Sequence, residues 1–125
     1  MAYDGVVSMD LETTGFSPTK NKILEIGVYL WVAKSNEYHI FERVINVGIV
    51  PTHITKITGI TSKESKEGVG ILSALSDLEA FIFSHLKRPL FVGHNLLKFD
   101  LPFLTPIRAI KLFVFVEAVI VDSET

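Results

Sequence analysis

The chain contains no cysteine, and this absence narrows the chemistry that is open to it. Without thiols, disulfides cannot form, and a bound metal must be held by oxygen or imidazole ligands. A strong charge of either sign is also missing, because 12 basic and 14 acidic residues give a net charge of −2. A nucleic-acid partner would therefore have to be attracted by local basic residues or bound cations, since the field of the whole molecule is not positive.

Long hydrophobic runs are missing too, and we expect no targeting signal. Residues 1–10 carry acidic residues early and have no extended apolar core of the kind found in signal peptides. The most apolar stretch, residues 110–121, is too short to cross a bilayer and contains Lys111 and Glu117. We expect a cytoplasmic protein with no membrane partner. Its 125 residues, 48% of them hydrophobic, fit one globular domain over residues 1–125.

The first half of the chain predicts a three-stranded antiparallel meander. A short strand is expected over residues 6–10, followed by turn-forming residues at 14–22. Residues 23–34 are nearly continuously apolar, which favours a strand buried on both faces. Residues 38–46 alternate in polarity and suit a strand nearer the edge of the sheet.

The second half predicts alternating helices and strands. Residues 52–68 are polar and are expected to form a loop. A helix should follow, because apolar residues recur there at helical spacing: Leu72, Leu75, Leu78, Ile82 and Leu86. A buried strand, the start of a helix and a last strand are expected over residues 90–95, 99–104 and 112–121. The order β-β-β-α-β-α-β fits the α/β or the α+β class, and we expect the later strands to lie parallel to the first, with sites at the strand ends.

Two carboxylates stand close together in the segment "MDLETTGF". Asp10 and Glu12 lie two residues apart, so on an extended backbone their side chains point to the same side. Such like charges repel unless a cation neutralises them, and hard oxygen ligands favour Mg²⁺ or Mn²⁺. Asp100, at a predicted helix start, could converge on the same point. Three acids around two divalent ions form the kind of ligand set that catalyses two-metal phosphoryl transfer.

The alternative interpretation of these acids is structural. Asp10 and Glu12 could be solvated, Thr13 and Thr14 could stabilise a turn, and Asp100 could cap a helix. For an Asp-x-Glu pattern alone this interpretation is the stronger one. The functional interpretation gains from three separate segments that occur in order.

Those segments are "MDLETTGF" with "KILEIGV", then "ITKITGIT" at 54–61, then "VGHNLLKFDLPFL" at 92–104. Together they resemble the DEDD-type 3′→5′ exonucleases, the group that contains the proofreading ε subunit of bacterial DNA polymerase III. The resemblance covers residues 6–104 and implies a ribonuclease H-like mixed sheet. One departure is the spacing of three residues between Asn95 and Phe99, where many ε-like members have two. The longer spacing is similar to that of TREX-type exonucleases and family-B polymerase proofreading domains.

The resemblance also implies roles for individual residues. Asp10 would bridge two Mg²⁺ or Mn²⁺ ions, Glu12 would bind the first ion and orient the attacking water, and Asp100 would bind the second. The substrate implied is the 3′ end of single-stranded DNA or RNA, with DNA favoured. The residues that would contact it are Thr13, Thr14, Gly15, Ile60 and Asn95. A polymerase or a second subunit is the kind of protein partner that the family implies.

The third motif of the family, a histidine or tyrosine followed by an aspartate, has no counterpart here. No histidine follows His94 and no tyrosine follows Tyr38, and "VIVDSET" resembles the strand before the missing helices. We therefore expect an exonuclease domain that lacks its C-terminal helices, with weak or no activity and a last strand that could support a homodimer. A truncated chain, a fragment completed by a partner and a non-catalytic nucleic-acid-binding or polymerase-associated module all remain open.

Overall fold

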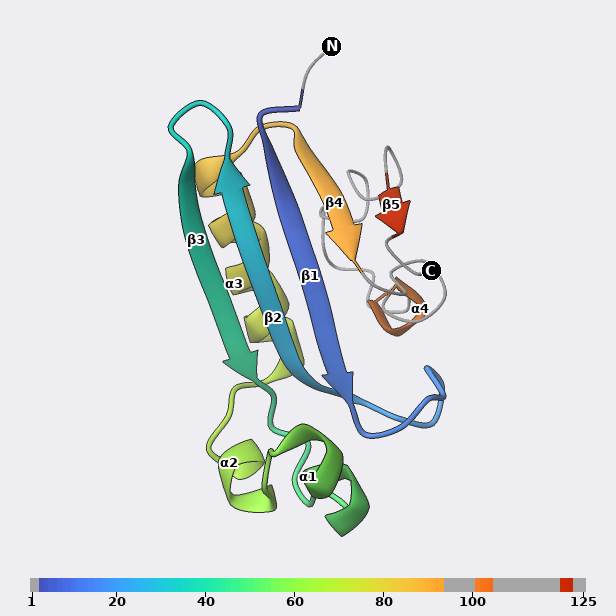
Figure 1. The fold of residues 1–125 in the computed structure, drawn as a ribbon. Coiled ribbons are helices and arrows are strands. Elements are labelled where there is room, and N and C mark those ends of the chain that lie inside the picture. The colour runs from blue at the N-terminus through green and yellow to red at the C-terminus, as the bar shows by residue number, and fades with distance from the viewer. Residues whose placement is uncertain (1–2, 94–100, 105–119, 123–125) are drawn as a thin grey trace.

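The structure is a computed structural model of the chain, and it describes residues 3–93, 101–104 and 120–122 (Figure 1). The strands are β1 (Gly5–Thr13), β2 (Ile23–Val32), β3 (Glu37–Val44), β4 (Pro89–Gly93) and β5 (Ile120–Asp122). The helices are α1 (Thr52–Thr58), α2 (Ser62–Lys66), α3 (Ile71–His85) and α4 (Leu101–Leu104).

The strands form one mixed sheet in the order β3-β2-β1-β4-β5. β1 pairs antiparallel with β2, and β2 pairs antiparallel with β3. On its other side β1 pairs parallel with β4, which pairs parallel with β5. The meander, the edge position of β3 and the parallel direction of the later strands are confirmed, and with them the α/β, ribonuclease H-like fold. Of the last predicted strand, only its C-terminal part lies within the described residues.

β1 is longer than predicted, and this changes where the paired acids lie. The strand runs on to Thr13, so Glu12 belongs to its paired section together with Asp10 instead of following the end of the strand. Asp10 lies opposite Gly27 of β2, and Glu12 lies opposite Glu25. The register shifts only after Glu12. Pairing with the long β2 keeps the segment extended despite its acidic residues.

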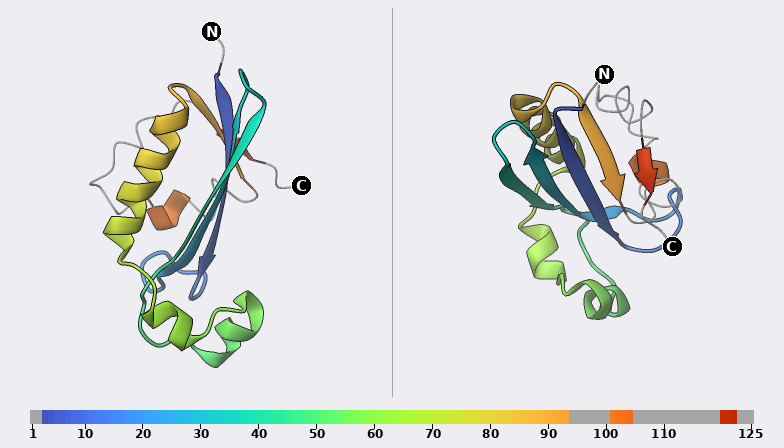
Figure 2. Two further views of the ribbon diagram at one scale, coloured as in Figure 1. Left: turned by 90° about the vertical axis from the view of Figure 1, so that its left-hand side faces the viewer. Right: turned by 45° about the horizontal axis from the view of Figure 1, so that its top comes forward.

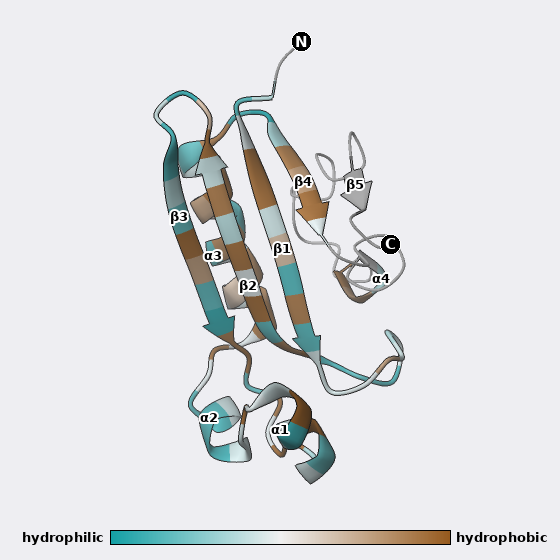
Figure 3. Cartoon of the chain, viewed as in Figure 1, coloured by the Kyte–Doolittle hydropathy of each residue, from teal (hydrophilic) through white to brown (hydrophobic). Residues whose placement is uncertain are grey.

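The sheet has one buried face and one open face within the described chain. Val7, Met9 and Leu11 of β1 are buried, and the residues between them are partly or fully exposed. α3 and α4 lie on the same side of the sheet, and hydrophobic and hydrophilic residues alternate along β1 (Figures 2 and 3). The prediction that residues 23–34 are buried on both faces is wrong, because alternate residues of β2 are accessible and Tyr29 is 59% exposed.

α3 supplies most of the helical side of the core. Leu75, Leu78 and Ile82 are fully buried, as their spacing predicted. Leu72 is 61% exposed, because it lies in the first turn on the face turned away from the sheet. Phe103 from α4 is buried in the same cluster, in agreement with a core role for this residue.

The predicted loop at residues 52–68 is wrong, because the segment folds into α1 and α2. Gly59 ends α1 with a φ of 79°, a left-handed conformation that glycine adopts without strain. Thr61 starts α2 through a capping box, in which its side chain and that of Glu64 each satisfy the other's backbone N–H group. A small second core holds these helices to the sheet and comprises Leu24, Val50, Ile54 and Ile60.

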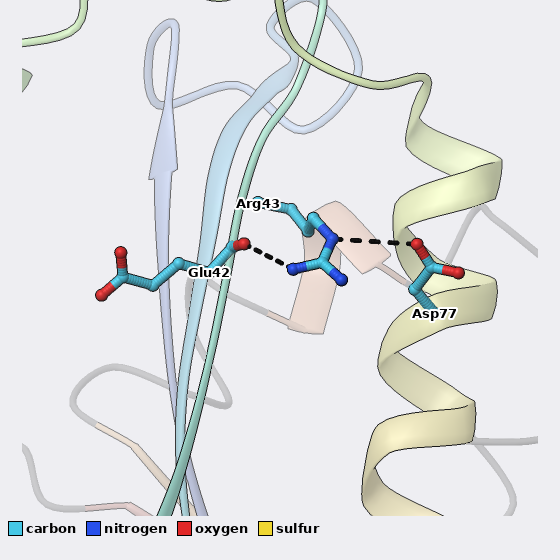
Figure 4. A network of polar contacts seen from close by, with 3 residues as sticks. All are labelled: Glu42, Arg43 and Asp77. Carbon is cyan, nitrogen blue, oxygen red and sulfur yellow. Dashed lines mark hydrogen bonds and ion pairs between the residues drawn. The ribbon is translucent and has the colours of Figure 1, made fainter.

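Polar and ring contacts join the edge strand β3 to α3. The Nε atom of Arg43 lies 3.7 Å from a carboxylate oxygen of Asp77, and its Nη1 donates to the backbone carbonyl of Glu42 (Figure 4). Nearer the other end of the strand, the rings of His39 and His85 stack with their centroids 3.9 Å apart. No helix in the described ranges is both long and apolar enough to cross a membrane.

Candidate active site

The paired acids lie on the sheet face opposite α3. Residues of β1 alternate between the two faces of the sheet. Val7, Met9 and Leu11 point to the buried face, so Asp10 and Glu12 share the opposite one. Asp10 is exposed and Glu12 is half-buried. This arrangement brings the two carboxylates to one side of the strand, as their spacing predicted.

Two further acids lie on the same face, and the sequence analysis missed both. Glu25 pairs across the sheet with Glu12, and Glu42 lies opposite Gly27, which lies opposite Asp10. Directly paired residues of neighbouring strands point to the same face. The signal that could have found them is the register of the meander, since aligning Glu12 with Glu25 places the acids in two adjacent rows.

Two of these acids, Glu12 and Glu25, have raised pKa values. Burial raises the pKa of Glu12 above 4.5, and the negative charge of Asp10 raises it further. Burial is also the largest cause that raises the pKa of Glu25, followed by the charges of Glu42, Glu12, Asp10 and Glu64. A divalent cation would remove this repulsion, and carboxylate oxygens are the ligands that Mg²⁺ and Mn²⁺ prefer. Asp10 and Glu12 therefore offer two oxygen ligands of the kind that suits a divalent metal ion.

A cavity of about 310 Å³ opens beside Glu12. It lies between the end of β1, the residues that follow it and α1. The lining residues are Leu11, Glu12, Thr13, Gly15, Phe16, His53, Ile54, Ile57 and Thr58. Phe16 is 88% exposed, and His53 is exposed as well. These two rings were not predicted as site residues, and an aromatic residue directly after "TTG" was the available signal for Phe16.

The two threonines of the motif hold the turn after β1 in shape. The Thr13 hydroxyl donates to the carbonyl oxygen of Gly15 at 2.6 Å. The Thr14 hydroxyl accepts from the backbone N–H of Lys22 at 3.0 Å, and the Thr14 N–H donates to the Lys22 carbonyl at 2.9 Å. Thr13 and Gly15 also line the cavity beside Glu12, whereas Thr14 lines a neighbouring one.

Gly15 has to be a glycine because Asn21 packs against its α-carbon. A β-carbon at this position would lie 2.4 Å from the Asn21 Oδ1 atom. That oxygen is in use, since it accepts a hydrogen bond from the Ser17 N–H at 3.0 Å. Any larger residue at position 15 would displace the Asn21 side chain and break this hydrogen bond.

The remaining predicted site residues differ in what the structure says of them. Ile60 is 5% exposed, packs in the second core and does not line the cavity, so its contacts are with the protein. Asn95 and Asp100 lie outside the described residues. β4 ends at Gly93, one residue after Val92, which pairs with Ser8 of β1. Within the described ranges, no three metal-ligating side chains form a group that could hold an ion.

A family model described as an RNase_T exonuclease matches residues 7–115. The chain belongs to this exonuclease family. Exonucleases of the family generally use divalent metal ions, in keeping with the acids on β1. No curated protein sequence shows significant similarity to the chain.

Solved exonuclease structures share the fold of this family member at low sequence identity. A full-length 3′-exonuclease matches with a TM-score of 0.68 and 17% identity, over 86% of this chain and 40% of that one. The cell-death related nuclease 4 (CRN-4) matches with a TM-score of 0.66 and 12% identity, over 82% and 40%. E. coli exonuclease I in complex with a 5cy-dA13 oligonucleotide matches with a TM-score of 0.65 and 14% identity, over 80% and 22%. The chain thus spans less than half the length of each of these proteins.

Proposed function

We propose that the chain is a 3′→5′ exonuclease that hydrolyses phosphodiester bonds at the 3′ ends of single-stranded DNA, using two Mg²⁺ or Mn²⁺ ions. The observation that carries this proposal is the pair of carboxylates on one face of β1, Asp10 and Glu12, of which Glu12 lines a cavity large enough for one nucleoside. Membership of the exonuclease family supports it.

Asp10 and Glu12 would hold the divalent ions, and Asp100 is the third ligand that the resemblance to DEDD-type exonucleases implies. When bound, the ions would lower the pKa of a water molecule and offset the charge on the leaving oxygen. The protein side chains have to be ionised for this, so the raised pKa of Glu12 makes ion binding stronger as the pH rises through that value.

The cavity beside Glu12 would receive the terminal nucleotide. Phe16 offers an exposed ring on which a base can stack, and His53 offers a ring nitrogen for a sugar or base contact. Because one nucleoside fills the cavity, the bond placed next to the acids is the last one of the strand. Cleavage there would release nucleoside monophosphates one at a time.

The choice of DNA is supported by a protein of the same fold. E. coli exonuclease I has been solved with a DNA oligonucleotide, and this chain matches its fold at 14% identity. A protein distinguishes DNA from RNA at the 2′-hydroxyl of the sugar. The assay therefore includes both substrates.

The test is an incubation with single-stranded oligonucleotides in Mn²⁺, one set labelled at the 3′ end and one at the 5′ end. We expect the 3′ label to be released first as a mononucleotide, while the 5′ label shows a ladder of products shortened one nucleotide at a time. Asp10→Ala should lower the rate at least 100-fold, because it removes the acid expected to contact both ions. Asp77→Ala, which removes an acid on α3, is the matched control and should keep the rate.

Three other results would overturn the proposal. Metal-dependent binding without shortening would identify a non-catalytic nucleic-acid-binding module. Internal cuts would identify an endonuclease. Equal rates of hydrolysis by Asp10→Ala and Asp77→Ala would show that the active site does not include Asp10 of β1. A faster reaction on RNA of the same sequence would change the substrate assigned here.

A further inference from the structure

A second cavity, of about 240 Å³, lies next to the one beside Glu12. It is formed by the connection between β1 and β2 on one side and by the segment between β3 and α1 on the other. Its lining residues are Thr14, Lys20, Asn21, Lys22, Val47, Ile49 and Pro51. We call this cavity the lysine groove. The two cavities are lined by neighbouring parts of the sequence: Thr14 of the lysine groove precedes Gly15 of the first cavity, and Pro51 lies two residues before His53.

The charge of the lysine groove is opposite to that of the sheet face with the acids. Lys20 and Lys22 are both exposed. Among the residues that the structure describes, no carboxylate forms an ion pair with either ammonium group, and the ion pair found there joins Arg43 and Asp77. Two exposed and unpaired cations beside a cavity suit an anionic ligand, in a chain whose net charge is −2.

The groove also offers apolar surface. Ile49 is 77% exposed at its rim, and Val47 is half-buried within it. Apolar side chains next to the two lysine ammonium groups suit a ligand that alternates phosphates with sugars and bases. A free phosphate would use the lysines only, whereas a nucleic-acid strand would use both kinds of surface.

Both walls of the groove are fixed by hydrogen bonds. On the first wall, the Asn21 N–H donates to the Ser17 carbonyl at 2.8 Å, and its side-chain oxygen accepts from the Ser17 N–H at 3.0 Å. On the second wall, the Val47 N–H donates to the buried hydroxyl of Ser65 at 3.0 Å, and the Val50 N–H donates to the Ser62 hydroxyl at 2.8 Å. The lysines are thus carried on backbone that is held in place, which lowers the entropy cost of ordering them on a ligand.

We propose that the lysine groove holds the sugar–phosphate backbone of the single strand whose terminal nucleotide occupies the cavity beside Glu12. Lys20 and Lys22 contact phosphates of the nucleotides that precede the terminal one. The inference deepens the proposed function and rests on it for the identity of the ligand. Its physical consequence is separate, because contact between lysines and phosphates needs no divalent ion.

The test is binding of fluorescein-labelled dT10 to the full chain in EDTA, followed by fluorescence anisotropy from 50 to 200 mM NaCl. The double variant Lys20→Gln/Lys22→Gln is compared with Lys34→Gln/Lys87→Gln. The control pair lies in the β2–β3 turn and the α3–β4 connection, at the opposite end of the sheet, and removes the same charge (Figure 1). For single strands, log K falls with log salt by about 0.7 for each phosphate neutralised, so two contacts contribute a slope of about 1.4.

We expect wild type and the control pair to lose about sevenfold more affinity than Lys20→Gln/Lys22→Gln over this fourfold salt range. The ratio of wild-type to variant affinity should also be larger for dT10 than for dT2, because the shorter ligand leaves most of the groove empty. Equal salt slopes for the two double variants, or no binding of dT10 by the wild type at 50 mM NaCl, would overturn the inference. Lysine-dependent binding without hydrolysis in Mn²⁺ would keep it and reject the proposed activity.

Discussion

The charge of Glu12 destabilises the folded chain at neutral pH. Its pKa is raised by burial and by Asp10, so the ionised side chain is less stable in the folded chain than in the unfolded one. This destabilisation is present above the raised pKa and disappears as the pH falls below the ordinary value of 4.5. Such strain is expected where charge is kept for binding a cation.

Glu12→Gln should therefore stabilise the metal-free protein. The side chain is only half-buried, so solvent screening limits the gain in Tm at pH 7 to about 1–3 °C. The gain should shrink toward zero as the pH falls through the raised pKa to below 4.5. Thermal unfolding in EDTA at several pH values measures this, with the exposed Glu67→Gln as the control. A Tm gain that does not depend on pH would show that charge is not its cause.

Phe16 is an exposed aromatic residue whose role we place in binding. Phe16→Ala should weaken the binding of a single strand by about 5- to 100-fold, because stacking on one base contributes roughly 1–3 kcal/mol. The Tm should change little, because the side chain is 88% exposed. Fluorescence anisotropy titrations measure the affinities of wild type, Phe16→Ala and Phe16→Trp, of which the last keeps an aromatic ring on which a base can stack. Equal affinities for wild type and Phe16→Ala would exclude the ring as a stacking surface.

The position of a side chain could be predicted where the spacing within a motif alone determines it. The spacing of Asp10 and Glu12 places them on one face of any strand, so their side-by-side position followed from the sequence. Glu25 and Glu42 were missed because they join the site only through strand pairing, which depends on register. Ile60 was taken for a ligand contact because a family motif does not show that its side chain faces the second core.

At the scale of elements, long periodic segments were predictable and short helices were not. β2, β3 and α3 have eight or more residues, so their apolar patterns are long enough to be recognised in the sequence. α1 and α2 have seven and five residues, too few for a period to show. Their helical state depends on a capping box, a left-handed glycine and tertiary contacts.

Ser65 of α2 is one of these contacts, and its loss should destabilise the protein. Its buried hydroxyl donates to the Ile45 carbonyl at 2.8 Å and accepts from the Val47 N–H at 3.0 Å. Ser65→Ala leaves both backbone groups without this partner and should lower the free energy of unfolding by about 1–3 kcal/mol. Urea denaturation measures the change. Ser73→Ala, at an exposed position of α3, should be neutral or slightly stabilising, and an equal loss in both variants would contradict the role given to Ser65.

The contact between β3 and α3 should make stability depend on pH. Burial lowers the pKa of His85 below 6.5 and the stacked His39 lowers it further, while Glu37 raises it in part. A lowered folded-state pKa gives stability that is present above pH 6.5 and is lost as the pH falls toward the folded-state value. His85→Phe keeps a ring against His39 without the proton. It should reduce the fall in Tm between pH 7.5 and 5.5 by about 1–2 °C, and parallel curves for variant and wild type would contradict this assignment.

At the scale of the whole molecule, the fold concentrates opposite charges on neighbouring surfaces. Asp10, Glu12 and Glu25 lie on the open face of the sheet near one end, and Lys20 and Lys22 line a groove at that end. The end of the sheet at which the acids lie could be predicted from the sequence, because sites gather where the strands of an α/β sheet end. The cavities could not, because they form between loops whose shape depends on hydrogen bonds far apart in the chain.

The central claim of this account is that the paired carboxylates of β1 hold the divalent ions on which hydrolysis depends. A Mn²⁺ titration followed by electron paramagnetic resonance of the free ion tests it most directly. We predict saturable binding to the wild type that is at least tenfold weaker in both Asp10→Asn and Glu12→Gln, and unchanged in Asp77→Asn. Equal affinities for wild type and Asp10→Asn would contradict the claim, as would a wild type that binds no Mn²⁺ at millimolar concentration.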